Sequence, residues 1–456
     1  MRVAYASPFP PATSGIADYS AALAPRLAEH VELELFHEGR LPPSTATIAG
    51  LRRRPVRELA SAADEFDLVL YHLGNSAPHH EESWRLALER PGVVVLHEFM
   101  FHHLVRELTL ARGDAAGYVE EMRYAAGETG RRAAQRLLDS HYPVDVWAFP
   151  LFERLVDRSL AVLVHSEFAR RRILASRPRA RVAAIPFPVD IERETPVDPE
   201  SRRAARLRIG LDGSAFLVGS FGFVTPQKHL EPALVAFARL RAAHPDARFL
   251  IVGEVSPHYD LAALLRATGG EGVVVTGRLD AERFADHVRA VDLAVNLRHP
   301  TGGETSASLF RLLACGVPTV ATDAGSFAEL PAGAIALVAV DELESEHLAA
   351  LFVRFAGDPA FAADLGRAGR RQVERHHAID AVAARIAVEL AAVAADPPRV
   401  EPPVPPLAPW SPLDPAVLMI REVGSALADL DLGEQDAEVS AALAAEIVDL
   451  GLDRSR

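Results

Sequence analysis

The chain has 456 residues, 49% of them hydrophobic, and a formal net charge of −14. This length exceeds what one hydrophobic core usually supports, so we expect two or three domains. The acidic charge argues against a general nucleic-acid binder, because phosphate backbones are bound by clustered positive charge. The single cysteine, Cys315, excludes an internal disulfide and a cysteine-based zinc site.

No apolar run approaches the roughly 20 residues of a membrane-spanning helix, and the N-terminus has no long apolar segment. We therefore expect a cytoplasmic protein without a transmembrane segment. A small basic patch leaves peripheral membrane contact open; it consists of Arg52, Arg53, Arg54 and Arg57. A solvated face is the simpler interpretation of this patch.

Short apolar runs alternate with helical patterns over the first 190 residues, which is typical of a parallel, doubly wound sheet. The loop before the helical pattern 17–27 contains Gly15, which lets the backbone approach a ligand closely. Residues 100–160 are mainly helical, with breaks near Pro143 and Pro150. Strands are expected at 3–6, 31–36, 67–72, 92–96, 160–164 and 182–185.

Three histidines fall at the carboxyl ends of predicted strands: His72, His97 and His165. Sheets of this kind bind ligands at that edge, so we expect at least one of the three to be functional. They do not look like a metal set, because no short His-x-His or His-x-x-x-His spacing links them.

A second doubly wound unit follows the polar, Arg- and Pro-marked segment 189–213. Lys228 is the only lysine among 48 Lys and Arg residues, and it directly precedes the helical pattern 229–243. A lysine at a helix N-terminus just past a strand suits a bound anion. Strands are expected at 215–221, 248–252, 272–276, 292–297 and 318–322.

The stretch 297–331 combines a strand end, a glycine-rich loop, a helical pattern from Ser308 to Cys315, and another strand. Backbone N–H groups at such a helix start favour an anion. Glu304 stands in the same loop. A carboxylate beside an anion site is explained if the ligand also carries hydroxyl groups, which points to a nucleotide sugar.

The C-terminal part changes character. A long Ala-rich helix is expected at 379–395, then a Pro-rich linker, then two acidic amphipathic helices that would dock on the body or on a protein partner. We expect five segments: an N-terminal Rossmann-like domain (1–190), a C-terminal Rossmann-like domain (191–375), a helix packing back on the body (376–396), the Pro-rich linker (397–411) and the acidic helical tail (412–456).

Several motifs resemble one family. They are SGIADYS (14–20), LHE (96–98), VHSEFAR (164–170), FGFVTPQK (221–228), FLIVGE (249–254) and GETSASLFRLLACGVPTVATDAG (303–325). Over about residues 1–395 the sequence resembles the retaining GT-B glycosyltransferases of family 4. The resemblance implies an α/β protein with two Rossmann-like domains facing a cleft, an acceptor-side domain first and a nucleotide-sugar-binding domain second.

The resemblance also implies site residues. The family typically places an arginine and a lysine on the donor diphosphate; Lys228 matches the lysine, but Phe223 stands at the arginine position. Glu304, about one residue out of register, resembles the glutamate that contacts the donor sugar. Arg311 stands where a second glutamate usually holds the ribose. Arg298 is our hypothesis for the missing positive charge, against the alternative of a solvated loop arginine.

The remaining assignments follow the same pattern. His97 matches a histidine near the donor sugar, and Gly15 would let the first-domain loop approach the phosphates. Glu304 alternatively needs no ligand, since the helix dipole satisfies it, and Ser308 is alternatively a simple N-cap. The other expected donor-binding residues are Arg278 near the base, and Gly303, Thr305, Ser306 and Ser308 at the distal phosphate.

The implied activity is transfer of a hexosyl group from a UDP- or GDP-linked sugar to a hydroxyl acceptor, with retention and without a metal or other cofactor. The acceptor would be a glycan, a lipid or a small molecule. Two alternatives stay open. One is a GT-B-shaped epimerase or phosphorylase, and the other is a non-catalytic GT-B scaffold that docks a partner through the acidic tail.

Overall fold

The computed structural model describes residues 1–39, 47–140, 143–211, 213, 215–398 and 400. The chain forms two compact units. One consists of Met1–Leu108 and Pro150–Glu401 and holds both β-sheets. The described part of the other lies within Thr109–Phe149. It contains η3 (Leu110–Arg112) and α5 (Ala115–Ser140), which is broken by non-helical angles at Ala126 and Gly127.

The first sheet has the strand order β3-β4-β2-β1-β5-β6-β7-β8, and every pair except β3–β4 is parallel. Its strands are β1 (Arg2–Ser7), β2 (Glu32–His37), β3 (Thr47–Ile48), β4 (Leu51–Pro55), β5 (Leu68–Leu73), β6 (Val93–Leu96), β7 (Ala161–Val164) and β8 (Val182–Ala184).

The second sheet has the order β11-β10-β9-β12-β13-β14 and is parallel throughout. Neighbouring residues of one strand serve different cores: Val218 and Phe249 pack with α9 and α13, whereas Leu217 and Leu250 pack toward α8, α11 and α12. This alternation is what a sheet covered on both faces requires. The strands are β9 (Leu217–Phe221), β10 (Arg248–Val252), β11 (Val273–Gly277), β12 (Leu293–Asn296), β13 (Thr319–Thr322) and β14 (Ala336–Val338).

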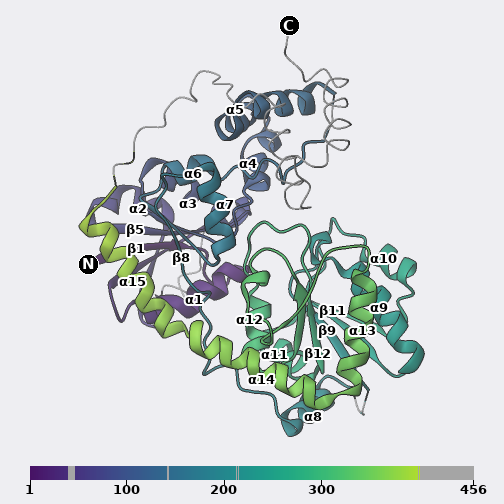
Figure 1. Ribbon diagram of the computed structural model, residues 1–456. Helices are drawn as coiled ribbons and strands as arrows, with labels where there is room; N and C mark the ends of the chain where they lie inside the picture. The colour runs from purple at the N-terminus through teal and green to yellow at the C-terminus, as the bar shows by residue number, and fades with distance from the viewer. Residues whose placement is uncertain (40–46, 141–142, 212, 214, 399, 401–456) are drawn as a thin grey trace, which may run out of the picture. The chain divides into compact units, whose positions relative to one another are not determined.

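Helices flank both sheets (Figure 1). They are α1 (Gly15–Leu27), α2 (Val56–Ala62), α3 (Ala77–Glu89), α4 (His102–Leu108), α6 (Glu153–Asp157), α7 (Glu167–Ser176), α8 (Pro199–Arg208), α9 (Leu230–Ala243), α10 (Leu261–Thr268), α11 (Ala281–Ala290), α12 (Ala307–Ala314), α13 (Glu344–Gly357), α14 (Pro359–His376) and α15 (Ile379–Ala395). Single 3₁₀ turns are η2 (Ala63–Glu65), η4 (Pro226–Lys228) and η5 (Phe327–Glu329). The expected α/β class with two doubly wound sheets is confirmed.

The C-terminal helix joins the core of the first sheet. Ile386 and Leu390 of α15 are buried in the same hydrophobic cluster as Leu23 and Leu27 of α1. The domain boundaries near residues 190 and 375 stay predictions. The acidic tail lies outside the described residues, as does the Pro-rich linker apart from positions 397, 398 and 400.

The arginines at residues 52–57 do not form the single solvated patch that the sequence predicts. The first three of them fall on β4, which the sequence analysis missed, and Arg57 lies in α2. Arg53 is buried, and its guanidinium donates to the Pro10 carbonyl (2.8 Å). Arg54 pairs with Glu34 and Glu58. Among the helices that the structure describes, none combines the length and apolar character needed to span a bilayer.

Candidate functional site

The second sheet reverses its strand order between β9 and β12, and in such sheets ligands bind outside the carboxyl ends of the strands at that point. Two loops meet there, one after β9 and one after β12. They are joined through the Phe221 carbonyl oxygen, which accepts from Lys228 Nζ (2.6 Å) and from Ser308 Oγ (3.2 Å). The predicted anion site therefore lies at the switch point of the sheet.

Lys228 ends η4, and His229, in the left-handed conformation, caps α9 after it. The Lys228 side chain is buried, and burial lowers its pKa to about 7, with a smaller effect of the nearby Arg298 in the same direction and an opposing effect of Glu304. A nearby anion stabilises the charged form of a buried ammonium group that would otherwise lose its proton near neutral pH. Phe223, at the position of the family's arginine, is 54% exposed.

The start of α12 supplies the expected amides. Ser306 is its N-cap, accepting from the Leu309 N–H (3.2 Å), so Ser308 is not the cap. The first turn of a helix leaves backbone N–H groups without intrahelical partners. Thr305 Oγ1 and Asn296 Nδ2 are buried and have no hydrogen-bond partner within the described chain. The helix start thus offers unpaired polar groups together with a positive dipole end.

Glu304 is surrounded by donors. Its Oε1 pairs with Arg298 Nε (3.0 Å), and its Oε2 accepts from the Gly302 N–H (2.7 Å) and from Thr301 Oγ1 (3.2 Å). Arg298 is therefore the partner of Glu304 rather than a solvated loop arginine, and both of them perturb the pKa of Lys228. The structure brings together Lys228, Arg298 and Glu304, as the sequence analysis grouped them.

The three predicted histidines meet at the edge of the first sheet. His72 Nδ1 lies 3.2 Å from His97 Nε2, and the His97 and His165 rings are 5.5 Å apart with Tyr19 against both. Burial lowers the pKa of all three, well below the usual range for His72 and His97 and to about 4 for His165. The cluster is therefore uncharged at neutral pH.

Glu98 belongs to the LHE motif (96–98), but the sequence analysis did not predict it as a site residue. The Phe99 N–H donates to the Gly302 carbonyl (2.8 Å), which ties the loop after β6 to the glycine loop. A methyl group placed on Gly302 would lie 3.4 Å from Glu304 Oε2 and 3.7 Å from Glu98 Oε2. Burial, then the Glu304 carboxylate, raise the pKa of Glu98 to about 8. The available signal was an acidic residue directly after a buried strand at the ligand edge.

The glycine loop also needs its glycine. Gly303 has a φ of +76°, and a methyl group there would lie 2.4 Å from the Phe99 ring. In contrast, nothing lies within 4 Å of such a group on Gly15, the first residue of α1. Gly15 therefore faces open space in this structure.

The predicted ribose region has its own charges. Arg311 Nε pairs with Glu194 Oε1 (2.7 Å), and its guanidinium lies 5.0 Å from the centre of the Phe284 ring. Arg278 lies 3.5 Å from Glu254. Burial raises the pKa of Asp18, in the first turn of α1, while Arg278 and Arg311 act in the opposite direction. Asp18, Arg278 and Arg311 therefore form a second charged group.

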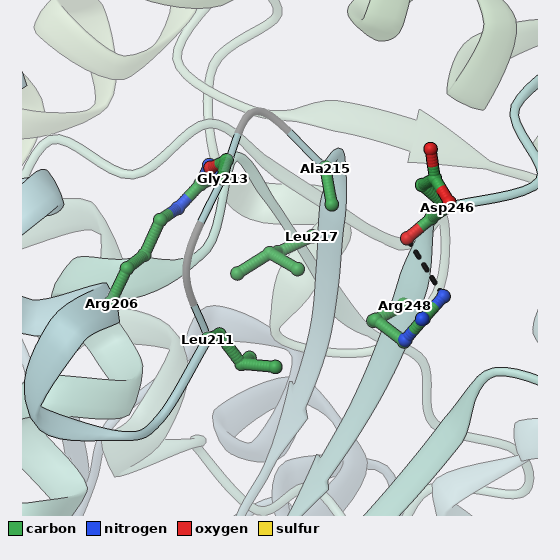
Figure 2. A pocket seen from close by; sticks show the side chains of 7 residues that line it. All are labelled: Arg206, Leu211, Gly213, Ala215, Leu217, Asp246 and Arg248. Atoms are coloured by element: carbon green, nitrogen blue, oxygen red, sulfur yellow. Dashed lines mark hydrogen bonds between the residues drawn. The ribbon is translucent and has the colours of Figure 1, made fainter.

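A separate pocket lies at the amino ends of β9 and β10, the edge opposite the switch point (Figure 2). Its lining consists of Arg206, Leu211, Gly213, Ala215, Leu217, Asp246 and Arg248. Arg248 donates to the Asp246 carbonyl (2.8 Å), and no predicted site residue lines this pocket. We do not assign the pocket to the site.

Comparisons with known proteins show what the chain resembles. Residues 214–358 match the family model for glycosyl transferases group 1. The chain is 30% identical over 196 residues to the GDP-mannose-dependent monoacylated alpha-(1-6)-phosphatidylinositol monomannoside mannosyltransferase of Corynebacterium glutamicum, covering 42% of this chain and 51% of that protein. It is 27% identical over 289 residues to the D-inositol 3-phosphate glycosyltransferase of Segniliparus rotundus, covering 62% and 58%.

The chain thus spans between half and three fifths of these two relatives. Solved structures share the fold: sucrose-phosphate synthase from Thermosynechococcus elongatus has a TM-score of 0.61 at 18% identity, covering 87% of this chain and 99% of that one. HepE of Anabaena, solved with UDP and glucose, has a TM-score of 0.61 at 16% identity, covering 86% and 100%. Residues 214–358 thus match the glycosyl transferases group 1, and the chain shares its fold with these solved glycosyltransferase structures.

Proposed function

We propose that the protein transfers a hexosyl group from a nucleoside-diphosphate sugar to a hydroxyl acceptor, with retention and without a metal. The observation that carries this proposal is the convergence of Lys228, the N-terminus of α12 and the Arg298–Glu304 pair at the switch point of the second sheet. The first two favour a diphosphate, and the third suits sugar hydroxyls.

The chemistry follows from these charges. As the bond between the anomeric carbon and the diphosphate oxygen breaks, negative charge grows on the diphosphate, and Lys228 and the α12 amides stabilise it. Glu304 accepts hydrogen bonds from sugar hydroxyl groups and holds the ring. The acceptor hydroxyl attacks on the face that the diphosphate leaves, and the departing phosphate oxygen takes its proton. The neutral His97 would position the sugar from the other loop.

The donor and acceptor are proposed from relatives. The mannosyltransferases of Corynebacterium glutamicum and Mycolicibacterium smegmatis are named as GDP-mannose-dependent and as acting on phosphatidylinositol mannosides. Their names support GDP-mannose as the first donor to test, with UDP-hexoses beside it. They also support a lipid of the phosphatidylinositol mannoside kind as the first acceptor, ahead of other glycans and small molecules.

A donor panel tests the proposal. The purified protein would be incubated with GDP- and UDP-hexoses in EDTA, with and without the lipid acceptor, and released nucleoside diphosphate measured. We expect release from one donor that falls at least about 100-fold in Lys228→Ala and is unaffected in Arg248→Ala, a matched loss of charge at the opposite sheet edge. Absence of nucleotide release in every arm, together with no donor binding by titration calorimetry, would reject the transferase and favour the scaffold.

One observation favours a second candidate, a GT-B epimerase. Such an enzyme needs an acid and a base around a sugar carbon, and Glu98 and Glu304 both flank Gly302. An epimerase that abstracts a sugar proton would exchange it with solvent. Incubation of the donor in D₂O would then place deuterium in the recovered nucleotide sugar, whereas a transferase would leave it unlabelled.

A further inference from the structure

Glu98 occupies a place in the site that the proposed transfer does not yet use. It follows β6 at the carboxyl edge of the first sheet, and its Oε1 accepts from the Asn75 N–H (3.1 Å). Its Oε2 points to the position beside Gly302 that Glu304 Oε2 also approaches. Two carboxyl groups, one from the loop after β6 and one from the loop after β12, therefore lie close to Gly302, with Met100 Cβ 2.9 Å from the same position.

The two carboxyl groups have opposite surroundings. Glu304 accepts hydrogen bonds from Gly302 and Thr301 and forms an ion pair with Arg298, whereas among the described residues Glu98 accepts from the Asn75 amide. The charged groups that face Glu98 are Glu304 and Arg298, from the loop after β12. His80 of α3 lies on its other side near Gly74, and burial holds the pKa of His80 at about 3, so it brings no charge.

One carboxyl of such a pair retains its proton, because two adjacent ionised carboxylates repel each other. Glu98, which has fewer polar partners than Glu304, is the carboxyl that retains its proton. The raised pKa of Glu98, about 8, agrees with this division. A protonated carboxyl donates a hydrogen bond, and an ionised one only accepts.

We propose that Glu98, in its protonated form, donates a hydrogen bond to a hydroxyl oxygen of the transferred hexosyl group, beside the hydroxyl that Glu304 accepts from. This inference rests on the proposed function and extends it. A sugar hydroxyl group can both donate and accept a hydrogen bond. A neutral acid next to a carboxylate therefore binds one hydroxyl group as an acceptor and its neighbour as a donor. Glu98 is then a sugar-contacting residue from the first sheet.

The test compares Glu98→Gln, which keeps a neutral donor, with Glu98→Ala, which removes it. Glu107→Gln is the matched control, because Glu107 accepts from the Ala77 N–H (3.1 Å) in the same structural way, near α3. At pH 7 we expect donor kcat/KM to fall about 10–100-fold in Glu98→Ala, and to stay within about 5-fold of wild type in Glu98→Gln and in the control.

The pH dependence of kcat/KM distinguishes a direct contact between Glu98 and the sugar from a purely structural role of Glu98. The kcat/KM profile reports the free enzyme, in which Lys228 and Glu98 must both be protonated. Above about pH 8 we expect log(kcat/KM) to fall with a slope approaching 2 in wild type and 1 in Glu98→Gln.

Wild-type kcat/KM in Glu98→Ala, or an unchanged slope in Glu98→Gln, with Lys228→Ala inactive, would overturn this inference and leave the transferase standing. Failure of the wild type to bind any donor would instead overturn the proposed function, and this inference with it.

Discussion

At the residue scale, Lys228 and Glu98 have pKa values shifted away from those they would have in water. Burial lowers the pKa of Lys228 to about 7 and raises that of Glu98 to about 8. Both shifts oppose the charged form, so both residues make folding less favourable at some pH values. Residues that destabilise the folded state in this way are expected at sites where a bound ligand offsets the destabilisation.

Glu98→Gln tests that cost. The folded pKa of Glu98 lies above its unfolded value, so its effect on stability is neutral below about pH 4.5 and becomes increasingly unfavourable as the pH rises to about 8. The glutamine variant does not titrate. We expect its Tm to equal that of wild type at pH 4.5 and to exceed it by about 2–5 °C at pH 8, by scanning calorimetry. An equal difference in Tm at both pH values would contradict this account.

Arg311 and Glu194 form a second residue-scale test. Their side chains are 29% and 14% exposed, so this pair is screened less than a surface pair. In a double-mutant cycle with Arg311→Met and Glu194→Gln, we expect a coupling free energy of unfolding of about 1–2 kcal/mol.

The control pair is Arg239 and Glu346, which are about half exposed at a similar distance of 2.8 Å. Its coupling should stay below about 0.5 kcal/mol. A coupling energy for Arg311 and Glu194 as small as that of the control pair would contradict this account.

At the element scale, the glycine loop before α12 is shaped by its contact with the loop after β6. The Phe99 N–H and the Gly302 carbonyl fix the two loops together, and the Phe99 ring occupies the space beside Gly303. The loop can therefore present Glu304 and the α12 amides only with a residue that lacks a side chain at position 303.

A comparison of Gly303→Ala with Gly333→Ala distinguishes the effect of a clash with the Phe99 ring from the effect of backbone strain at positive φ. Both residues have positive φ, +76° and +90°, but only Gly303 has a neighbour in the way. We expect Gly333→Ala to lower the free energy of unfolding by about 1 kcal/mol and to leave donor affinity unchanged. Gly303→Ala should cost about 1–3 kcal/mol more and weaken donor binding at least about 10-fold, by urea unfolding and calorimetry. Equal effects of the two substitutions would argue against the contact.

Much of this arrangement was predictable from sequence, because long apolar periodicity fixes which strands exist and parallel order brings their carboxyl ends together. The expected gathering of Lys228 with Glu304, and of the three histidines with one another, follows from this order and is observed. The rest depends on contacts distant in sequence. Nothing local indicates that Glu194 reaches Arg311, or that Ser306 rather than Ser308 caps α12. The short strand β4 was missed because its three consecutive arginines hide the single buried one, Arg53.

At the scale of the whole molecule, the described residues contain every residue of the candidate site. After the second sheet, the chain returns to the first sheet at α15, whose Ile386 and Leu390 share a hydrophobic core with α1. We therefore expect the proposed donor chemistry to need the chain up to the end of α15. The role of the acidic tail in partner binding remains a proposal.

Removal of residues 397–456 tests this division. We expect the shortened chain to keep donor turnover within about 2-fold of wild type, because the site and its supporting cores are intact. A second shortening that also removes α15 should destabilise the protein severely, since it exposes the apolar face of α1. Loss of donor turnover in the first variant, with its Tm unchanged, would place part of the site in the tail.

Donor binding linked to Lys228 tests the central claim most directly. Titration calorimetry at pH 7.5 in two buffers of different ionisation enthalpy measures the protons taken up with the donor sugar nucleotide. A diphosphate beside Lys228 should raise its pKa from about 7, so we predict uptake of roughly half a proton or more by wild type. Lys228→Arg, which is always charged, should bind without that uptake. Donor binding with equal proton uptake in both proteins, or no binding by wild type, would contradict a diphosphate site at Lys228.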